Sequence, residues 1–288
     1  MDSRDVAAFL SMASFWALNY PLVKFALIYE PPLFILVFRV LFAAIFSVIF
    51  LSRNFSIPKD LKTHLSIAVV GLLNVVMFMG FWFTGELTEP SSISSIIVYT
   101  YPIFAMAFST AFLGERPSRY KIAGTVVGFA GIVFVFADQL YIKPGIGLVF
   151  LISGAISWAV GTIYFKRHLS SANVLSVNAL QFVYALPIIL VWAFMMQPFR
   201  ISGFTPQFFV ITLFMGSLGS AVAYYIYFHL FRKYDVSSIS SFFFIVPALS
   251  IVFAYLILGE TNTIFTYIGF ALISLGIYLT SRSSRRSG

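Results

Sequence analysis

The sequence contains no cysteine and few charged residues, and both absences narrow the classes of protein that it can encode. Cysteine is absent from all 288 residues, which excludes a disulfide framework and any thiolate-based metal or redox site. Only 10% of the residues are charged, whereas soluble domains have about 25%. So few charges cannot keep a soluble surface wetted. The chain is therefore not expected to be a soluble globular protein.

The sequence also lacks the motifs of nucleotide-binding and metal-dependent enzymes. It has no G-x-G-x-x-G, no G-x-x-x-x-G-K-[ST] and no H-E-x-x-H segment. Its three histidines, His64, His168 and His229, do not have the spacing of metal ligands. We therefore expect no enzyme activity, no cofactor, no metal and no direct use of ATP.

Apolar residues are abundant, at 60% of the chain with a mean hydropathy of +0.96. They occur in runs of about 20 residues, the length that crosses a bilayer core as a helix. Asp2 and Asp5 make a poor signal-peptide n-region, so the first run is taken as a retained helix. The predicted fold is an all-α membrane protein with ten transmembrane helices, at 6–28, 32–52, 65–85, 91–113, 119–137, 146–166, 173–196, 206–231, 237–258 and 264–281.

Basic residues lie almost entirely on one side of the predicted helices. The side that holds both termini has 14 of the 18 Lys and Arg residues, the other side has Lys143 and Arg200, and Lys24 and Arg39 lie within spans. The positive-inside rule then predicts a multi-pass protein of the plasma membrane with both termini in the cytoplasm. The net charge of +8 is thus an orientation signal facing anionic lipid, and no nucleic-acid partner is expected.

Sequence signals recur at fixed offsets along the chain. Pro102 and Pro247 each precede a Leu-Gly-Glu segment at the same distance, which defines one offset between two copies, here called the long offset. Trp16 and Trp158 are related by a slightly smaller offset, here called the short offset. A single three-residue insertion accounts for the difference between the long and the short offset. Each half contains five predicted helices, and an odd number inserts the second half upside down. We expect a five-helix repeat at 1–137, an inverted five-helix repeat at 146–281 and a basic cytoplasmic tail at 282–288. Inverted repeats are typical of secondary transporters.

Taken together, these signals resemble one family. They are Trp16-Ala-Leu-Asn-Tyr-Pro-Leu-Val-Lys24, Arg39, Tyr99-Thr-Tyr-Pro102, Leu113-Gly114-Glu115 and Leu258-Gly259-Glu260. Their order and spacing resemble the EamA-type family of the drug/metabolite transporter superfamily over the whole chain. The resemblance implies a ten-helix bundle that works by alternating access and exports, or facilitates the movement of, amino acids or other small metabolites. The chain departs from some relatives in its 35 phenylalanines and in having no mid-membrane carboxylate.

Two charged residues within the spans are the first candidates for substrate binding. A charge inside the bilayer is unfavourable unless it faces a cavity or a partner. Lys24 lies toward the outer end of the first helix, where it can either snorkel to the surface or reach the pathway. Arg39 lies about 10 Å below the outer end of the second helix, at ~1.5 Å per residue, with Glu30 as the nearest acid. We expect Arg39 to face the pathway, whereas its counterpart at the short offset, Gln181, is uncharged.

Aromatic and polar residues complete the predicted substrate site, although each type also occurs in packed interiors and interface belts. They are Trp16, Asn19, Asn74, Tyr99, Trp158 and Tyr224. Pro102 and Pro247 lie in the middle of predicted helices, where a proline removes a backbone donor. They are predicted to be hinges, with a static kink as the alternative. Small-residue faces are predicted to let helices pack closely, within the monomer or against another copy; they consist of Gly124, Gly128, Gly131, Gly269 and Gly276.

The predicted function is secondary transport of amino acids or other carboxylate-bearing metabolites, because basic groups near the pathway have no buried acid beside them. A multidrug or cation–proton antiporter would need a membrane carboxylate, and a nucleotide-sugar-type exchanger stays open. A membrane enzyme or scramblase would need a polar cluster at one interface, which the sequence does not show. The expected partners are a small-molecule substrate and the lipid bilayer, and the chain is expected to be a monomer or homodimer.

Overall fold

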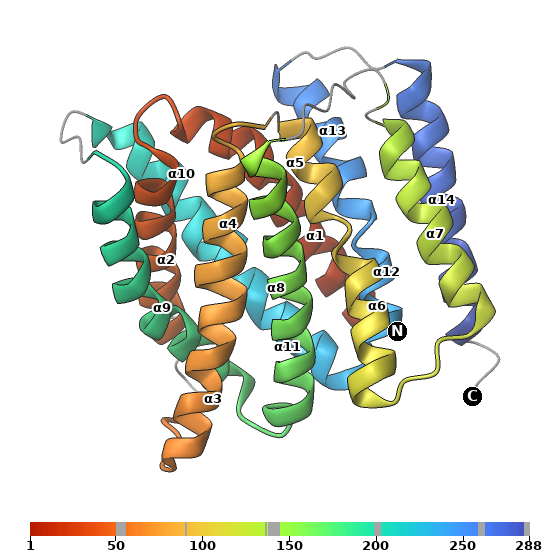
Figure 1. Cartoon of the computed structure of the whole chain (residues 1–288), viewed down its shortest axis with the longest axis horizontal. Helices are drawn as coiled ribbons and strands as arrows, with labels where there is room; N and C mark the ends of the chain where they lie inside the picture. The colour runs from red at the N-terminus through yellow and green to blue at the C-terminus, as the bar shows by residue number, and fades with distance from the viewer. Residues whose placement is uncertain are drawn as a thin grey trace.

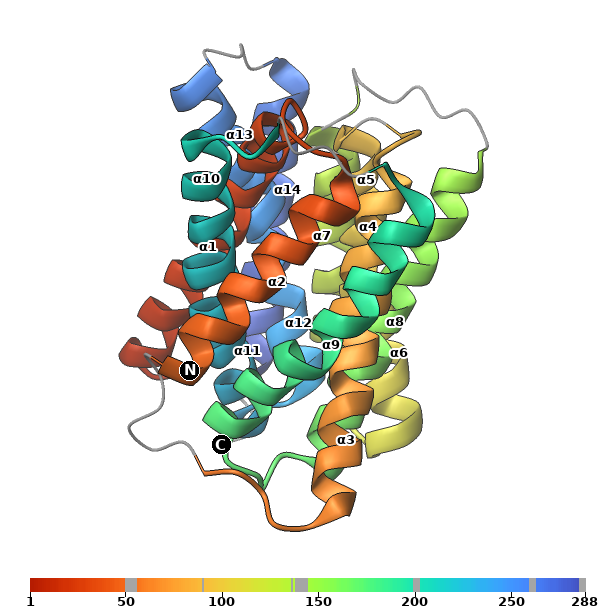
Figure 2. The same cartoon turned by 90° about the vertical axis from the view of Figure 1, so that its left-hand side faces the viewer.

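The structure, a computed structural model, is a bundle of helices packed side by side (Figure 1, Figure 2). It describes residues 1–49, 56–89, 91–135, 137, 145–198, 203–258 and 263–284, which contain helices and connections but no strand. The N-terminus and the C-terminal end of the last described helix, Ile264–Ser284, lie toward the same end of the bundle, the lower end in Figure 1. We call this end, which holds Asp2, Lys121 and Lys233, the terminal end.

The helices follow the apolar segments of the sequence, with η denoting a π-helical segment. The first half consists of α1 (Ser3–Ala26), α2 (Pro32–Ile49), α3 (Leu61–Gly71), η2 (Leu72–Met77), α4 (Phe78–Gly85), α5 (Ser91–Val98), α6 (Tyr101–Leu113) and α7 (Arg119–Val135). The second half consists of α8 (Ile146–His168), α9 (Val174–Met196), α10 (Pro206–Gly216), η5 (Ser217–Val222), α11 (Ala223–Lys233), α12 (Val236–Phe242), α13 (Ile245–Leu258) and α14 (Ile264–Ser284).

Seven of the described segments are long and apolar enough to cross a bilayer. They are Ser3–Val23, Pro32–Ile49, Leu61–Gly85, Ile96–Leu113, Ile146–His168, Val174–Met196 and Pro206–Lys233. Each coincides with one of the ten predicted spans. The other three predicted spans fall on α7, on α12 with α13, and on α14; in the last two, the apolar helical segments within the described residues, Val236–Ser250 and Ile264–Thr280, are shorter. The structure thus has the architecture of a multi-pass helical membrane protein.

Helix boundaries recur at the two offsets that the sequence shows. The π-helical segments η2 and η5 begin and end at positions related by the long offset, and so do the starts of α5 and α12 and the starts of α7 and α14. The starts of α2 and α9 are related by the short offset. A π-helical turn is rare and is found mostly at functional sites. The two halves therefore share an uncommon backbone feature at equivalent positions.

The two proline-containing spans are interrupted. Residues 99–100 separate α5 from α6, and residues 243–244 separate α12 from α13. Pro102 and Pro247 therefore lie in the first turn of a new helix, which corrects their predicted place in mid-helix. The physical reason is that Pro102 has no N–H for the carbonyl of Val98, so the ladder of the preceding helix ends there. The predicted role of both prolines as hinges stays a prediction.

The glycine-rich helices α7 and α14 pack against each other at one side of the bundle (Figure 1). A Cβ on Gly276 would lie 2.6 Å from the backbone oxygen of Gly124 and 2.6 Å from the nitrogen of Gly128. A Cβ on Gly131 would lie 2.9 Å from the oxygen of Gly269. Since no side chain fits between them, the two backbones are in contact. The predicted small-residue faces are confirmed as a packing surface, which lies inside the monomer.

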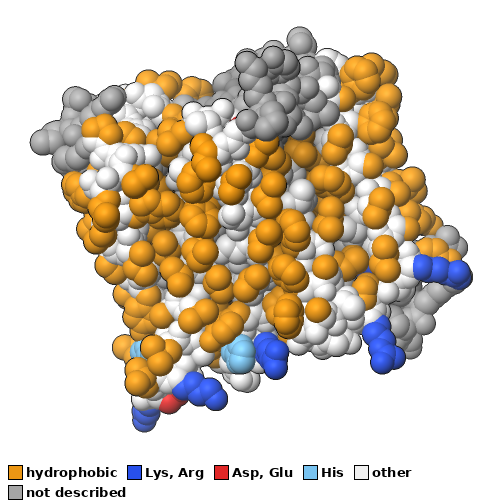
Figure 3. Space-filling model, viewed as in Figure 1, with side chains coloured by type: hydrophobic (Ala, Val, Ile, Leu, Met, Phe, Trp, Pro, Cys, Tyr) orange, Lys and Arg blue, Asp and Glu red, His pale blue; other side chains and the backbone are white. Residues whose placement is uncertain are grey.

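Charge and apolar surface are segregated on the face shown in Figure 3. The Lys and Arg side chains visible there lie along the lower edge, at the terminal end, and apolar side chains cover the area above them. Lys143 and Arg200, the basic residues predicted for the other side, lie outside the described residues, as do Glu260 of the second Leu-Gly-Glu segment and residues 285–288 of the predicted tail. The cytoplasmic location of both termini remains a prediction from the charge bias.

Candidate functional site

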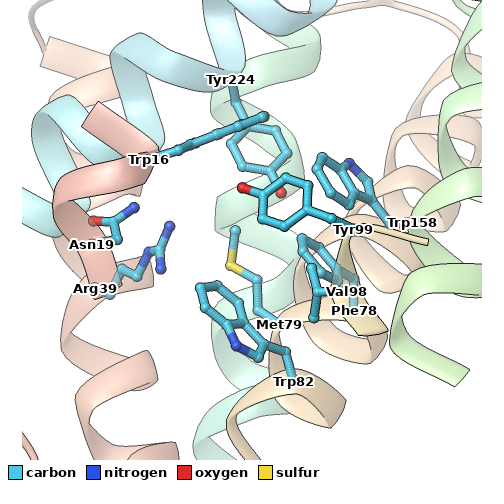
Figure 4. A pocket seen from close by; sticks show the side chains of 10 residues that line it. All are labelled: Trp16, Asn19, Arg39, Phe78, Met79, Trp82, Val98, Tyr99, Trp158 and Tyr224. Atoms are coloured by element: carbon cyan, nitrogen blue, oxygen red, sulfur yellow. The ribbon is translucent and has the colours of Figure 1, made fainter. Parts of the chain in front are cut away.

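A small cavity lies near the middle of the bundle, among α1, α2, α4, α8, α11 and the end of α5 (Figure 4). The space open to the centres of water molecules is about 30 Å³, which is room for about two waters. In this conformation the cavity is therefore too small to hold a metabolite. It is lined by Trp16, Asn19, Arg39, Phe78, Met79, Trp82, Val98, Tyr99, Trp158 and Tyr224.

Aromatic rings form most of the cavity wall. Trp158 is stacked between Tyr101 and Phe78, with ring centroids 3.8 and 4.5 Å away. Trp16 meets Trp158 edge-on at 5.6 Å, and Tyr224 lies 5.7 Å from Trp16. Stacked and edge-to-face pairs of this kind hold one another in place beyond the effect of their buried area. The wall is therefore rigid and apolar.

Arg39 and Asn19 form the polar side of the cavity, opposite the stacked rings (Figure 4). The Arg39 side chain is almost completely buried, at 1% exposure. Its Nε donates a hydrogen bond to Oγ of Ser220 at 2.8 Å, and its Nη2 donates to the oxygen of Gly219 at 3.3 Å. A guanidinium stays protonated in proteins, so Arg39 places a fixed positive charge at the cavity.

The π-helical segment η5 carries the acceptor that holds this side of the cavity. The N–H of Ala223, which follows η5, donates to the carbonyls of Leu218 and Ser220. Nε1 of Trp16 donates to the carbonyl of Gly219 at 3.1 Å, and the Arg39 guanidinium donates to it as well. One carbonyl of the π-helical turn thus accepts from two side chains that line the cavity.

Six of the eight predicted site residues line this cavity. Asn74 does not line it: its side chain lies against Gly161 from its place on η2, and its backbone oxygen accepts from Tyr224 Oη at 3.3 Å. Lys24 lies on α1, but its side chain is outside the described part of the structure. The six residues that line the cavity are Trp16, Asn19, Arg39, Tyr99, Trp158 and Tyr224.

Asn19 and Asn74 make equivalent contacts with exchanged partners. Asn19 lies against Gly219 and Asn74 against Gly161, and a Cβ on either glycine would overlap the amide oxygen. The counterpart of Asn19 at the short offset is Gly161, and that of Asn74 at the long offset is Gly219. Among the described residues, Oδ1 of Asn19 and both polar side-chain atoms of Asn74 have no hydrogen-bond partner. Each such buried group carries a penalty of about 1–3 kcal/mol, which a polar ligand or water would relieve.

Four residues that line the cavity are not among those predicted from the sequence, namely Phe78, Met79, Trp82 and Val98. Phe78 and Trp82 follow Asn74 at successive four-residue steps, and a regular α-helix would place all three on one face. The π-helical turn at 72–77 rotates that face. As a result, Phe78 and Trp82 line the cavity and Asn74 does not.

Charged contacts hold the connection between α11 and α12 at the terminal end. Nζ of Lys233 donates to Asp2 at 2.7 Å and to Asp5 at 2.6 Å, and the Tyr234 hydroxyl donates to Asp5 at 2.6 Å. The hydrogen bond from Lys233 lowers the pKa of Asp2 to about 2. Lys121 pairs with Asp235 at 3.3 Å. The start of α1 and the start of α7 are thus both tied to the same connection.

Glu115 of the first Leu-Gly-Glu segment adds a contact to this connection. Gly114 ends α6 with a positive φ of 69°, a conformation that favours glycine. The Glu115 carboxylate then accepts from the backbone N–H groups of Val236 at 2.7 Å and Ser237 at 2.9 Å. It therefore caps the first turn of α12, whose N–H groups have no partner within the helix.

Comparison with known proteins identifies the family. The model of the EamA-like transporter family matches the chain twice, at residues 4–137 and 145–282. The chain belongs to the EamA-like transporter family. The uncharacterized transporter YvbV of Bacillus subtilis (strain 168) is 30% identical over 272 residues, which cover 94% of this chain and 89% of YvbV. YoaV of the same organism, also an uncharacterized transporter, is 28% identical over 285 residues, 96% of this chain and 97% of YoaV. A crystal structure with 17% identity has the same fold, with a TM-score of 0.87 and 99% of both chains covered.

The EamA assignment confirms the resemblance seen in the sequence. The chain is therefore a membrane transporter. Both matched segments contribute to the cavity. Trp16 and Arg39 come from the first segment, and Trp158 and Tyr224 come from the second. The two EamA units therefore meet at the cavity that the sequence-predicted residues line.

Proposed function

We propose that this EamA-family protein is a secondary transporter of small carboxylate-bearing metabolites, and that amino acids are the favoured class. The observation that carries the proposal is the placement of Arg39 and Asn19 on one side of an otherwise aromatic cavity. A guanidinium binds a carboxylate through two parallel hydrogen bonds. The free Oδ1 of Asn19 can accept from an ammonium group, and the opposing rings suit an apolar side chain.

We infer that transport proceeds by alternating access between two inverted five-helix repeats, 1–137 and 146–281, with both termini in the cytoplasm. Three observations support this inference. Both family segments line the cavity, the π-helical turns and helix interruptions occupy equivalent positions, and the cavity of about 30 Å³ must expand before it can admit a substrate. Expansion requires the halves to move, which is the motion that inverted repeats provide. We expect the carrier to work as an exporter or by facilitated diffusion.

The charge of the cavity argues against cation–proton antiport. Arg39 would repel a cationic drug, and no carboxylate occurs among the described residues that line the cavity. A proton-coupled cation carrier needs an acid that exchanges its proton for the cation. The carboxylate reading therefore fits this site better.

Uptake into proteoliposomes tests the proposal. Labelled amino acids, nucleotide sugars and quaternary amines are compared, with and without a pH gradient. We expect uptake of amino acids, a weaker rate for Arg39→Lys, and a further loss for Arg39→Gln. Lysine lacks the planar fork and glutamine lacks the charge. Loss of a hydrogen bond to a charged group costs about 1.5–3 kcal/mol. Such a loss corresponds to a fall in substrate affinity of about 10- to 150-fold.

Arg167→Gln is the matched control, because Arg167 is an exposed arginine at the terminal end of α8. It should transport at the parent rate. Preference for quaternary amines over carboxylates would contradict the proposed substrate. If transport by the Arg39 variants falls only in parallel with their thermal stability in detergent, Arg39 has a structural role alone.

A further inference from the structure

A second and larger cavity lies at the terminal end. Its volume is about 690 Å³ on the same measure as the central cavity. Lys121, Lys233 and Asp235 lie at its charged rim, while Phe9 of α1 and Phe242 of α12 belong to its apolar part. Residues of both charge signs meet at this rim, and mostly apolar side chains line the rest.

A single layer of aromatic rings separates the terminal cavity from the central one. The ring of Phe243 lies 5.4 Å from Trp16 and 5.8 Å from Trp158, both of which line the central cavity. The same ring lies 5.6 Å from Phe9, and Phe9 packs edge-on against Phe242 at 6.0 Å. Phe9 and Phe242 both line the terminal cavity. Phe243 itself is completely buried between the two groups.

The backbone at Phe243 is the interruption between α12 and α13. Phe243 N–H donates to Ser240 at 3.0 Å, and its carbonyl accepts from Val246 at 3.0 Å, which are turn-like bonds of three-residue spacing. A helix that is broken at this point can change the angle between its two parts with little loss of hydrogen bonding. The repeat counterpart, Val98, also lies at a helix interruption and lines the central cavity, but it has a much smaller side chain.

We propose that the terminal cavity is the mouth of the transport pathway at the terminal end, and that Phe243 is the gate residue between this mouth and the central cavity. In the conformation described here the ring closes the pathway on the terminal side. Movement of α12 relative to α13 withdraws the ring from between Trp16 and Phe9 and joins the two cavities. The opened pathway then carries the ion pair of Lys121 and Asp235 at its mouth. This gate rests on the proposed transport function, but its test requires no substrate.

Single-cysteine labelling tests the gate directly, because the chain has no cysteine of its own. Met79→Cys reports on the central cavity and Ser238→Cys on the terminal cavity. A membrane-impermeant thiol reagent is added from the side that holds the termini. The orientation of the protein in the vesicles is determined from the accessibility of a tag on the N-terminus. We expect Phe243→Ala to raise the labelling rate of Met79→Cys by about tenfold or more, as the population of the open conformation rises. The rate for Ser238→Cys should not change.

Phe244→Ala is the matched control. Phe244 is the next residue in the same interruption and is equally buried. Its ring packs against Gly128 of α7 and lines neither cavity. A rise in Met79→Cys labelling with Phe243→Ala, and none with Phe244→Ala, supports the gate.

Two results would overturn it. In the first, Phe243→Ala leaves the labelling rate of Met79→Cys at the parent value. In the second, Phe244→Ala raises that rate as much as Phe243→Ala does, which would indicate loosened packing. If Phe243→Ala does not yield folded protein, Phe243→Val, which copies Val98, is judged by the same comparison. Proteoliposome uptake measures the transport function separately, so the gate and the function can fail independently.

Discussion

The cap that Glu115 places on α12 leads to a quantitative prediction about the closed terminal end. The carboxylate accepts from Val236 and Ser237 across the interface between the two halves. The α12 segment leads directly to the interruption at Phe243. If α12 moves when the terminal end opens, these two hydrogen bonds exist only in the closed conformation. Their removal should then favour opening.

The size of the effect follows from the energy of a helix cap. Replacing an N-terminal capping side chain by alanine costs about 1 kcal/mol on average and up to about 2 kcal/mol. A difference of one to two kcal/mol changes an equilibrium by a factor of about 5 to 30. Glu115→Ala should therefore raise the open population by about 5- to 30-fold. Glu115→Gln keeps one acceptor oxygen and should give an intermediate value.

Asp60 provides the control for this prediction. It caps α3 by accepting from the N–H of Thr63 at 2.7 Å. Asp60→Ala should lower the melting temperature in detergent without changing the labelling of Met79→Cys from the terminal side. Glu115→Ala should change both. Suppose that Glu115→Ala and Asp60→Ala lower the melting temperature equally and that neither changes the labelling of Met79→Cys. The Glu115 cap is then not specific to one conformation, and the prediction is wrong.

Two further predictions concern stability in detergent. Because Lys233 lowers the pKa of Asp2 from 3.8 to about 2, the contribution of this contact is complete above about pH 4 and disappears as the pH falls toward 2. The difference in melting temperature between the parent and Asp2→Asn should stay constant from about pH 8 to about pH 5. Loss of this difference near neutral pH would contradict the prediction. Gly276→Ala should destabilise by about 1–3 kcal/mol through overpacking, because its Cβ would lie 2.6 Å from the Gly124 oxygen. Gly154→Ala, whose Cβ would meet nothing nearer than 3.2 Å, should be milder, and equal melting temperatures would argue against backbone contact between α7 and α14.

Most helix positions could be predicted from the sequence, because a segment in lipid must satisfy its backbone hydrogen bonds within a helix. The predicted span at 206–231, for example, coincides with Pro206–Lys233. The π-helical turns could not be predicted, since Leu72–Met77 reads Leu-Leu-Asn-Val-Val-Met, like any apolar helix. That one extra residue in the turn displaced Asn74 from the cavity.

The site was predictable where a residue type is rare inside a membrane. Arg39 is such a residue, and it lines the central cavity, while its role in substrate binding stays a prediction. Its hydrogen bonds to Gly219 and Ser220 join distant parts of the chain, and only the folded structure shows them. Phe78 could not be singled out, because it is one of 35 phenylalanines in the chain. Aromatic type alone carries no information on which side of a helix a ring lies.

The exchanged contacts of Asn19 with Gly219 and of Asn74 with Gly161 bear on the evolution of the protein. An assembly of two first halves would place asparagine against asparagine at both contacts, where the carboxamides would overlap. An assembly of two second halves would place glycine against glycine and leave two holes. Only a mixed pair fills each place with one carboxamide. These two contacts therefore favour the pairing of a first half with a second half over the pairing of like halves, and the presence of both halves in one chain fixes that one-to-one ratio.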